Sequence, residues 1–354
     1  MQKYRMFVIA CIPLYFLIVQ AAPERKVIVG VNSWYTPPKT SQDEVIDQLA
    51  KNGVKAIRIS LLPNTKDYII KAYRRGIGTV AIVYPSSGGK AKPKKSWADV
   101  PVSEVNPQEL SDWFKRELDE LEAAGVRLTA IELGNEFNTS GYNGDVPSPG
   151  SHRVLGIADL KNPNDREASA IAVGYRAYIK AAGAVKDLRD HSKLNQQTPI
   201  IAGGLANVGP PSPKSWDNAV GVSIADTIKF LRENGLDKSV DGYGVHVYPG
   251  LDPSRLAATR IAALGRDIFS ECTQAKPCWL TEWGIPNPDQ SCPINETKRI
   301  QVIQELRDAF KYFVKQGKLA AIIYYDWMDA PGSNGQLIRC GDLTEAGKLA
   351  LSPL

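Results

Sequence analysis

The sequence predicts an α/β protein built as a single (β/α)8 (TIM) barrel, and three observations lead to this prediction. Eight short apolar runs recur along the 354-residue chain. Amphipathic segments with helix-capping signals separate most of these runs. Polar residues follow the runs mainly at their C-terminal ends, where a parallel barrel carries its chemistry.

Each predicted strand is nearly continuous in apolar character, as expected for parallel strands that are covered on both faces. The eight strands are Val27–Val31, Ala56–Ser60, Gly78–Val83, Leu128–Leu133, Pro199–Ala202, Gly242–Val247, Cys278–Thr281 and Ala320–Tyr325. An open doubly wound sheet is the alternative. The first strand-to-helix turn, however, lacks the Gly-rich phosphate-binding fingerprint of that fold.

Capping signals in the sequence mark where several predicted helices begin and end. Ser41 and Glu44 have capping-box spacing, and Asn106 before Pro107 is a good N-cap for a helix that Gly125 would end. Further helices are expected at Ala168–Leu188, Ser223–Asn234, Pro253–Phe269, Glu296–Gln316 and Thr344–Leu351.

The N-terminus is typical of a secretory signal peptide. Lys3 and Arg5 precede an apolar stretch, Met6–Val19, that is short for a membrane span, and a small-residue cleavage site ends at Ala21. We expect residues 1–21 to be the signal and 22–354 to be one barrel domain, secreted or otherwise periplasmic or extracellular. An uncleaved anchor, or a lipoprotein attached at Cys11, is the alternative.

The net charge and the cysteine content narrow the class of protein. The net charge of +5 falls to +3 without Lys3 and Arg5, and no basic stripe with interleaved aromatics suggests nucleic-acid binding. Three widely spaced histidines argue against a zinc or copper site, and we expect no cofactor, no membrane contact after cleavage and a monomer. The four remaining cysteines allow three pairings, of which strand placement favours Cys272–Cys278 and Cys292–Cys340.

Polar and aromatic residues gather at the predicted strand ends. They are Asn32, Trp34, Arg58, Ser60, Tyr84, Asn135, Glu136, His246, Tyr248, Glu282, Trp283, Asp326 and Trp327. Buried charges are costly unless they are paired, so Arg58 should share one pocket with Glu136 and Glu282. Two carboxylates held in this way are what acid-assisted cleavage of a glycosidic bond requires.

These strand-end residues resemble clan A of the glycoside hydrolases, the retaining (β/α)8 enzymes that include the family 5 cellulases and mannanases and the family 39 enzymes. The resemblance rests on Asn135-Glu136, His246-Val247-Tyr248, Glu282 and Trp327. Phe137 departs from the Asn-Glu-Pro of family 5, so the clan is better supported than any one family.

The resemblance implies roles for individual residues. Glu136 would be the general acid/base and Glu282 the nucleophile. Other residues would bind substrate or support the pair: Asn135 the sugar 2-hydroxyl, Tyr248 and Arg58 the nucleophile, His246 the same subsite and Trp327 its hydrophobic floor. Asn32, Trp34, Tyr84 and Trp283 are further candidate contacts, and Tyr35, Trp97 and Tyr142 are candidate stacking platforms.

Electrostatics should separate the two glutamates. Arg58 and Tyr248 should keep Glu282 charged, whereas Glu136, with no predicted cationic partner, should have a raised pKa. Glu132 on the same strand as Glu136 is expected to form a buried pair with a basic residue.

The predicted function is therefore hydrolysis of a β-linked polysaccharide or oligosaccharide by double displacement. A non-catalytic glycan-binding barrel and a transglycosylase are the alternatives. The long loop from Thr139 to Asp165 should shape the aglycone side. The run of Lys90, Lys92, Lys94 and Lys95 is either a solvated face or a rim for an acidic glycan.

Overall fold

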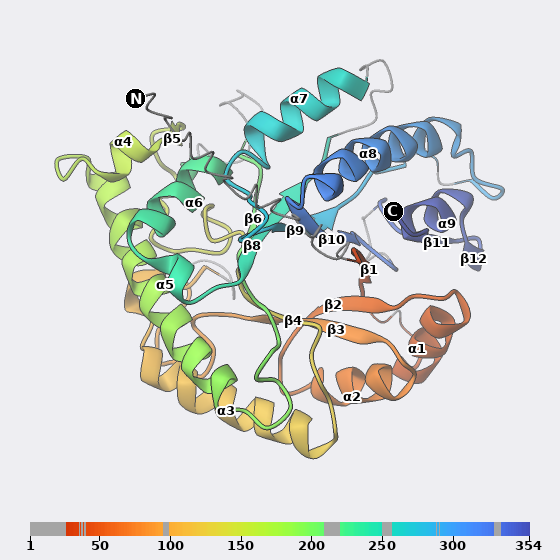
Figure 1. The fold of residues 1–354 in the computed structure, drawn as a ribbon, viewed down its shortest axis with the longest axis horizontal. Helices are drawn as coiled ribbons and strands as arrows, with labels where there is room; N and C mark the ends of the chain where they lie inside the picture. The colour runs from red at the N-terminus through yellow and green to blue at the C-terminus, as the bar shows by residue number, and fades with distance from the viewer. Residues whose placement is uncertain are drawn as a thin grey trace, which may run out of the picture.

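The computed structural model describes residues 26–34, 36, 38, 40–94, 99–208, 220–249, 257–287, 289, 291–328 and 334–354. Eight parallel strands close into a barrel in the order β1-β10-β9-β8-β6-β4-β3-β2, with helices around it (Figure 1). The strands are β1 (Ile28–Asn32), β2 (Ala56–Ser60), β3 (Gly78–Val83), β4 (Ala130–Asn135), β6 (Ile200–Leu205), β8 (Gly242–Val247), β9 (Cys278–Trp283) and β10 (Leu319–Tyr324). The predicted (β/α)8 barrel is confirmed.

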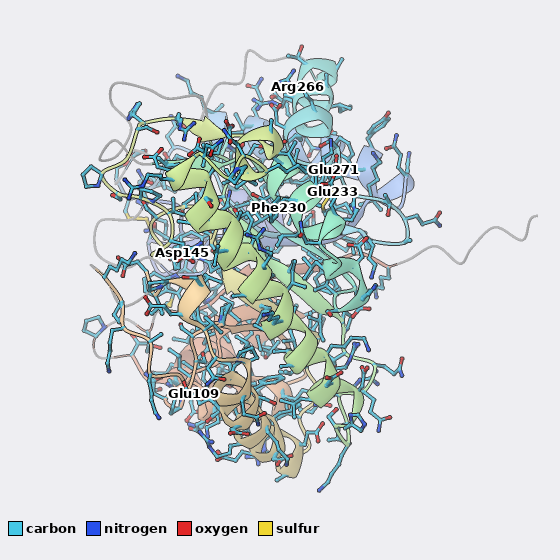
Figure 2. All side chains as sticks on the ribbon, turned by 90° about the vertical axis from the view of Figure 1, so that its left-hand side faces the viewer. Glu109, Asp145, Phe230, Glu233, Arg266 and Glu271 are labelled. Atoms are coloured by element: carbon cyan, nitrogen blue, oxygen red, sulfur yellow. A yellow bond between two sulfur atoms is a disulfide. The ribbon has the colours of Figure 1, made fainter. Side chains whose placement is uncertain are left out.

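The helices form the outer layer. They are α1 (Gln42–Lys51), α2 (Lys66–Arg74), α3 (Pro107–Ala123), α4 (Ile157–Leu160), α5 (Arg166–Asp190), α6 (Ile224–Glu233), α7 (Ala257–Asp267), α8 (Thr297–Lys315) and α9 (Glu345–Leu351). Figure 2 shows α5 lying along the outside of the barrel, with side chains packed beneath it. Part of the helix predicted at Pro253–Phe269 lies outside the described residues.

The predicted caps form as expected. The Ser41 hydroxyl accepts from the Glu44 backbone N–H (3.2 Å), and the Glu44 carboxylate accepts from the Ser41 N–H (2.6 Å). The Asn106 side chain accepts from Gln108 at the start of α3. Gly125 adopts a left-handed φ of 81° just after α3 ends, a conformation that glycine enters without steric cost. Local sequence therefore sets where these helices begin and end.

The barrel interior changes character along its axis. Its base is filled by small and aliphatic side chains and one tryptophan, namely Val80, Ala130, Ile201, Trp279, Ala320, Ala321 and Ile323. Arg58 and Glu132, both buried, lie near the middle of their strands, and Arg58 extends from there to Asn135 and Glu282 at the C-terminal ends. The apolar base supports a polar upper layer, and the candidate site sits on that layer.

Two short sheets decorate the C-terminal face. β5 (Val154–Leu155) pairs with β7 (Gly221–Val222), and β11 (Ile338–Arg339) pairs with β12 (Asp342–Leu343). Two disulfides join Cys272 to Cys278 and Cys292 to Cys340. This is the pairing that the strand placement favoured.

Among the described residues, no helix combines the length and the apolar character needed to cross a membrane. The predicted signal peptide, residues 1–21, lies outside the described residues.

Candidate active site

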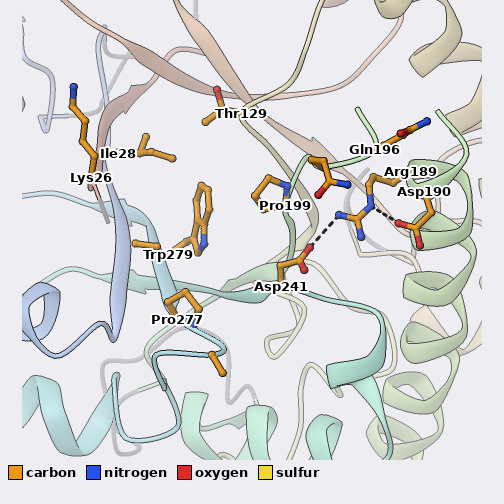
Figure 3. A pocket seen from close by; sticks show the side chains of 13 residues that line it. Lys26, Ile28, Thr129, Arg189, Asp190, Gln196, Pro199, Asp241, Pro277 and Trp279 are labelled. Atoms are coloured by element: carbon orange, nitrogen blue, oxygen red, sulfur yellow. Dashed lines mark hydrogen bonds and ion pairs between the residues drawn. The ribbon is translucent and has the colours of Figure 1, made fainter. Parts of the chain in front are cut away.

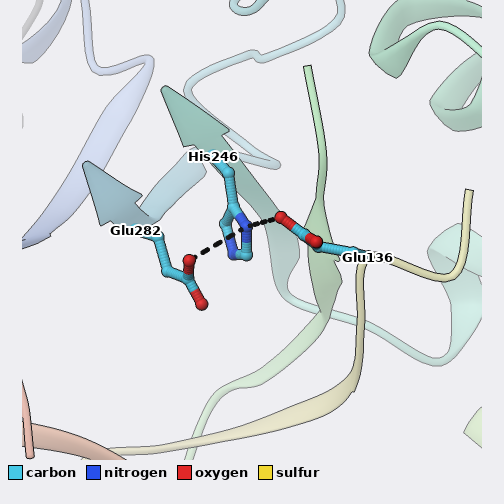
Figure 4. A group of neighbouring side chains, drawn as sticks. All are labelled: Glu136, His246 and Glu282. Atoms are coloured by element: carbon cyan, nitrogen blue, oxygen red, sulfur yellow. Dashed lines mark hydrogen bonds and ion pairs between the residues drawn. The ribbon is translucent and has the colours of Figure 1, made fainter. Parts of the chain in front are cut away.

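Glu136 and Glu282 face one another at the C-terminal end of the barrel. Glu136 follows β4 directly, and Glu282 is the penultimate residue of β9. Figure 4 shows both carboxylates turned toward His246 of β8. One carboxylate oxygen of each glutamate and one nitrogen of His246 lie within 4.8 Å of one another.

Arg58 ties the buried half of this site together. Its Nη1 atom lies 2.6 Å from Oε1 of Glu282, and its Nε atom 2.5 Å from Oε2 of Glu132. The same guanidinium donates to the Oδ1 atoms of Asn32 (3.0 Å) and Asn135 (2.7 Å). Burial opposes the charge of Arg58, but Glu132 and Glu282 outweigh it and raise the Arg58 pKa. The expected pairing of Glu132 with a basic residue is confirmed.

Tyr248 holds the other oxygen of Glu282. Its hydroxyl donates to Oε2 at 2.5 Å. Burial of the hydroxyl and the nearby charge of Glu282 raise the Tyr248 pKa well above its ordinary value. The hydroxyl therefore stays protonated and remains a donor, so each oxygen of Glu282 has a hydrogen-bond donor, Arg58 on one and Tyr248 on the other.

The expected rise in the Glu136 pKa is wrong. Burial favours a rise, but Nδ1 of His246 lies 2.8 Å from Oε1 of Glu136, and this hydrogen bond, the His246 charge and the Arg58 charge together lower the pKa of Glu136. Sequence reasoning assigned Glu136 no cationic partner, because His246 is 110 residues away along the chain.

The backbone at Glu136 adopts an uncommon conformation. Glu136 has a φ of 41°, in the left-handed region that non-glycine residues seldom adopt. Its N–H donates to the carbonyl of Gly204 on β6 (2.6 Å). A β-carbon on Gly204 would stand 2.1 Å from Nε2 of His246, so a glycine is required there for the imidazole to reach Glu136.

Most of the predicted contact residues do converge on this site. The aromatic ring of Tyr84 lines a small pocket with Asn135 and Tyr142. The pKa of Tyr84 is raised, first by burial, and the charges of Arg58, Glu132 and Glu282 also act on it. Trp34 lies on the rim, with Nε1 donating to Oδ2 of Asp326 (3.1 Å).

Trp283 and Trp327 do not line the site. Trp283 is fully buried and packs edge-on against Phe310 of α8 and Tyr324 of β10, in the apolar layer outside the barrel. Trp327 is also fully buried, in the same apolar cluster. Neither side chain is therefore proposed as a substrate contact. Tyr35 and Trp97 lie outside the described residues.

Tyr325 is the aromatic residue that sequence reasoning missed. It follows β10, and a cis peptide bond joins it to Asp326. Its ring meets that of Tyr248 edge-on at 6.3 Å. Its pKa is raised, first by burial and then by the charges of Glu282 and Asp326. Successive side chains of a strand point to opposite faces. Tyr324 faces α8, where Arg299 donates to its hydroxyl, so the alternation along β10 was the signal that Tyr325 points inward.

The loop after β4 forms a wall beside Glu136. Asn138 is fully buried and fastens this loop to the one after β6: its amide donates to the carbonyls of Ala206 and Val222, and its Oδ1 accepts from the Ala206 N–H. The pairing of β5 with β7 extends the same junction.

The lysine run lies partly in solvent and partly against the loop after β4. Lys90 and Lys92 are exposed, with Nζ of Lys90 3.8 Å from Glu109. Lys94 donates from Nζ to the carbonyl of Gly144 in the loop after β4. Lys95 lies outside the described residues.

Two other features have the spacing or the volume of a binding site. Glu136, His246 and Glu282 have the spacing of metal ligands, but Arg58 already neutralises Glu282 and Nδ1 of His246 is bonded to Glu136, which disfavours a cation. A cavity of about 720 Å³ lies at the opposite, N-terminal end of the barrel (Figure 3). Its arginine, Arg189, is paired with Asp190 and Asp241, so its charges are balanced internally.

Comparison with known proteins bears on the fold. No protein-family model matches the chain, and no curated protein matches it in sequence. Among solved structures, a fungal β-1,4-galactanase shares 14% identity over 91% of this chain and 93% of its own, with a TM-score of 0.52. A family 1 β-glucosidase from Thermotoga maritima shares 16% over 87% and 84% (TM-score 0.51). An endo-1,4-β-D-mannanase from Thermotoga petrophila shares 14% over 92% and 98% (TM-score 0.51).

Identities this low establish the fold and leave the individual family open. The chain shares the barrel fold of these glycoside hydrolases, so the fold implied by the resemblance of its strand-end residues is confirmed.

Proposed function

We propose that this chain is an exported, retaining β-glycoside hydrolase that uses Glu282 as nucleophile and Glu136 as general acid/base. The observation that carries the proposal is the separation of the two carboxylates, whose nearest oxygens lie within 4.8 Å. Retaining enzymes hold their carboxyls about 5–5.5 Å apart, whereas inverting enzymes need about 6.5–9.5 Å to admit a water molecule between acid and base.

The surroundings of the two glutamates favour this division of roles. Glu282 is ion-paired with Arg58 and accepts from Tyr248, which suits an anionic nucleophile. Glu136 is more exposed than Glu282, with 26% of its side chain accessible against 11%. Exposure suits a group that must exchange protons with a leaving group and then with water.

The reaction proceeds in two displacements. An oxygen of Glu282 bonds to the anomeric carbon while the glycosidic C–O bond breaks and the departing oxygen takes the proton of Glu136. Water then attacks the same carbon, the ester bond to Glu282 breaks, and Glu136 takes the proton from that water.

The lowered pKa of Glu136 makes the first proton transfer depend on substrate. A sugar that covers Glu136 removes water from its carboxylate, and this desolvation favours the protonated form. In the glycosyl-enzyme the charge of Glu282 is gone, so the pKa of Glu136 falls again and the group can act as base. The acid and the base are then one residue at two stages.

The proposed substrate is a β-linked glycan. The galactanase, β-glucosidase and mannanase that share the fold are named for β-glycans or β-glycosides, and Asn135 beside the catalytic pair is suited to bind a sugar hydroxyl. Because Lys90 and Lys92 are exposed cations, the proposed substrates include acidic glycans. The two disulfides are consistent with export, and a monomer is proposed.

The test begins with hydrolysis of a panel of β-glucans, β-mannans, β-galactans and uronic acid polymers by the purified protein. Glu282→Ala should abolish turnover, and azide should restore it with formation of a glycosyl azide. Glu104→Ala, at an exposed glutamate, is the matched control and should keep full activity.

The other outcomes each contradict a part of the proposal. Near-wild-type turnover by Glu282→Ala would refute the nucleophile assignment. Transfer of sugar to glycan acceptors in place of water would indicate a transglycosylase, and binding of a glycan without turnover would indicate a binding barrel.

A further inference from the structure

Three aromatic side chains line the rim of the barrel on the side of Glu282. They are Trp34 after β1, Tyr325 after β10 and Tyr248 after β8, and we call them the aromatic shelf. Since β1, β10, β9 and β8 are consecutive around the barrel, the shelf spans the strand that carries the nucleophile.

The shelf is exposed to an unusual degree. Trp34 and Tyr248 each have 48% of their surface accessible, the highest values among the large hydrophobic side chains of the described residues. Exposed aromatic faces beside a polar cleft bind the apolar faces of a ligand. Sugar rings have such faces, with C–H groups on one side and hydroxyls at the edge.

The inner part of the shelf is packed around Glu282. Tyr248 donates to the nucleophile and meets Tyr325 edge-on. A β-carbon on Gly284 would lie 2.6 Å from the Tyr325 carbonyl oxygen and 3.4 Å from Cε1 of Tyr248, so both residues close over this glycine. In the proposed reaction, the sugar unit bonded to Glu282 would lie beside these two rings.

The outer part of the shelf is Trp34, which is held in place by a buried carboxylate. Asp326 is 1% exposed, and its Oδ2 accepts from Nε1 of the indole at 3.1 Å. Trp34 is also within hydrogen-bonding reach of Tyr325. An exposed indole that is fixed through its N–H keeps one orientation, which lowers the entropic cost of binding to its face.

We propose that Trp34, oriented by Asp326, is the platform for a second sugar unit on the glycone side, so that full activity requires a glycone of at least two units. The inference rests on the proposed function and adds the length of the substrate. Trp34 would contact substrate, and Asp326 would be a positioning residue that acts through Trp34.

The test compares aryl β-glycosides that carry one, two or three sugar units of the glycan identified by the panel. For the wild type, kcat/KM should rise at least tenfold from one unit to two. Trp34→Ala should remove this rise, a loss of roughly tenfold for a single aromatic contact, and its effect on the one-unit substrate should be much smaller. The loss should appear mainly in KM.

Two further variants separate positioning from folding. Asp326→Asn keeps an oxygen acceptor for the indole and should retain most of the rise, whereas Asp326→Leu should lose it. Tyr73→Ala, at an exposed aromatic on α2, should behave as the wild type. Equal loss on all three substrates in Trp34→Ala, or a wild type that prefers one unit, overturns the inference. Absence of any hydrolysis by the wild type would contradict the proposed function instead.

Discussion

Nδ1 of His246 lies 2.8 Å from Oε1 of Glu136, and 3.5 Å from Oε2 of Glu282. The imidazole thus stands between two carboxylates of opposite proposed roles. A donor at this position stabilises the ionised form of Glu136, which explains why the pKa of Glu136 is lowered in spite of burial.

Replacement of His246 should therefore change the pH profile. His246→Phe removes the donor, so the pKa of Glu136 rises and this residue stays protonated to higher pH. The basic limb of kcat/KM, which reports the acid of the free enzyme, should move to higher pH. His246→Gln, which keeps an N–H donor, should move it less. A limb that stays in place, or moves to lower pH, would contradict the assignment.

Glu136→Gln should discriminate between substrates by their leaving groups. Aryl glycosides with acidic phenols need little proton assistance, so their first displacement should remain fast and the glycosyl-enzyme should accumulate. Natural glycosides should lose activity by a factor of about 10²–10⁴, the range for general acid catalysis. Burst kinetics on the aryl substrate measure this difference, and an equal loss on both substrates would argue against an acid role.

Tyr248→Phe removes only the hydroxyl that donates to Glu282. Hydrogen bonds to charged groups contribute about 1.5–3 kcal/mol, so kcat should fall roughly tenfold to a hundredfold while the ring remains on the shelf. Tyr312→Phe on α8, where the tyrosine is exposed, is the matched control. Unchanged kcat in Tyr248→Phe would show that the hydroxyl is dispensable.

Arg58→Met should destabilise the fold as well as abolish activity. It leaves the buried carboxylate of Glu132 without its cation, and breaking a buried pair in this way costs about 3–5 kcal/mol. Urea denaturation of the double variant Arg58→Met/Glu132→Gln should show partial recovery of stability without recovery of activity. Additive losses in the double variant would mean that the two side chains do not interact.

The fold could be predicted from the sequence more completely than the site could. The limits of β2, β3 and β8 were predicted to the residue, because an apolar run bounded by polar or turn residues marks a buried parallel strand. Helix α2 (Lys66–Arg74) was missed, because it is short and Thr65 at its start makes no side-chain capping hydrogen bond, so no cap signal marks it in the sequence.

The sequence predicted which residues belong to the site better than it predicted which way their side chains point. Glu136, Glu282, Arg58 and Tyr248 converge because the C-terminal ends of parallel strands meet at one face. After β10, Trp327 was expected to form the floor of the subsite but is fully buried in the apolar core, whereas Tyr325, which was assigned no role, packs against Tyr248. Which side chain turns inward depends on the chain path beyond the strand, and this path is set by contacts with distant residues, such as the Trp327 N–H with the Asn32 carbonyl.

The most direct test of the account is the configuration of the first product, followed by proton NMR during hydrolysis of an aryl β-glycoside. Double displacement through Glu282 predicts that the β-anomer appears first and only then equilibrates with the α-anomer. Initial release of the α-anomer would mean single displacement, which contradicts the roles proposed for Glu136 and Glu282.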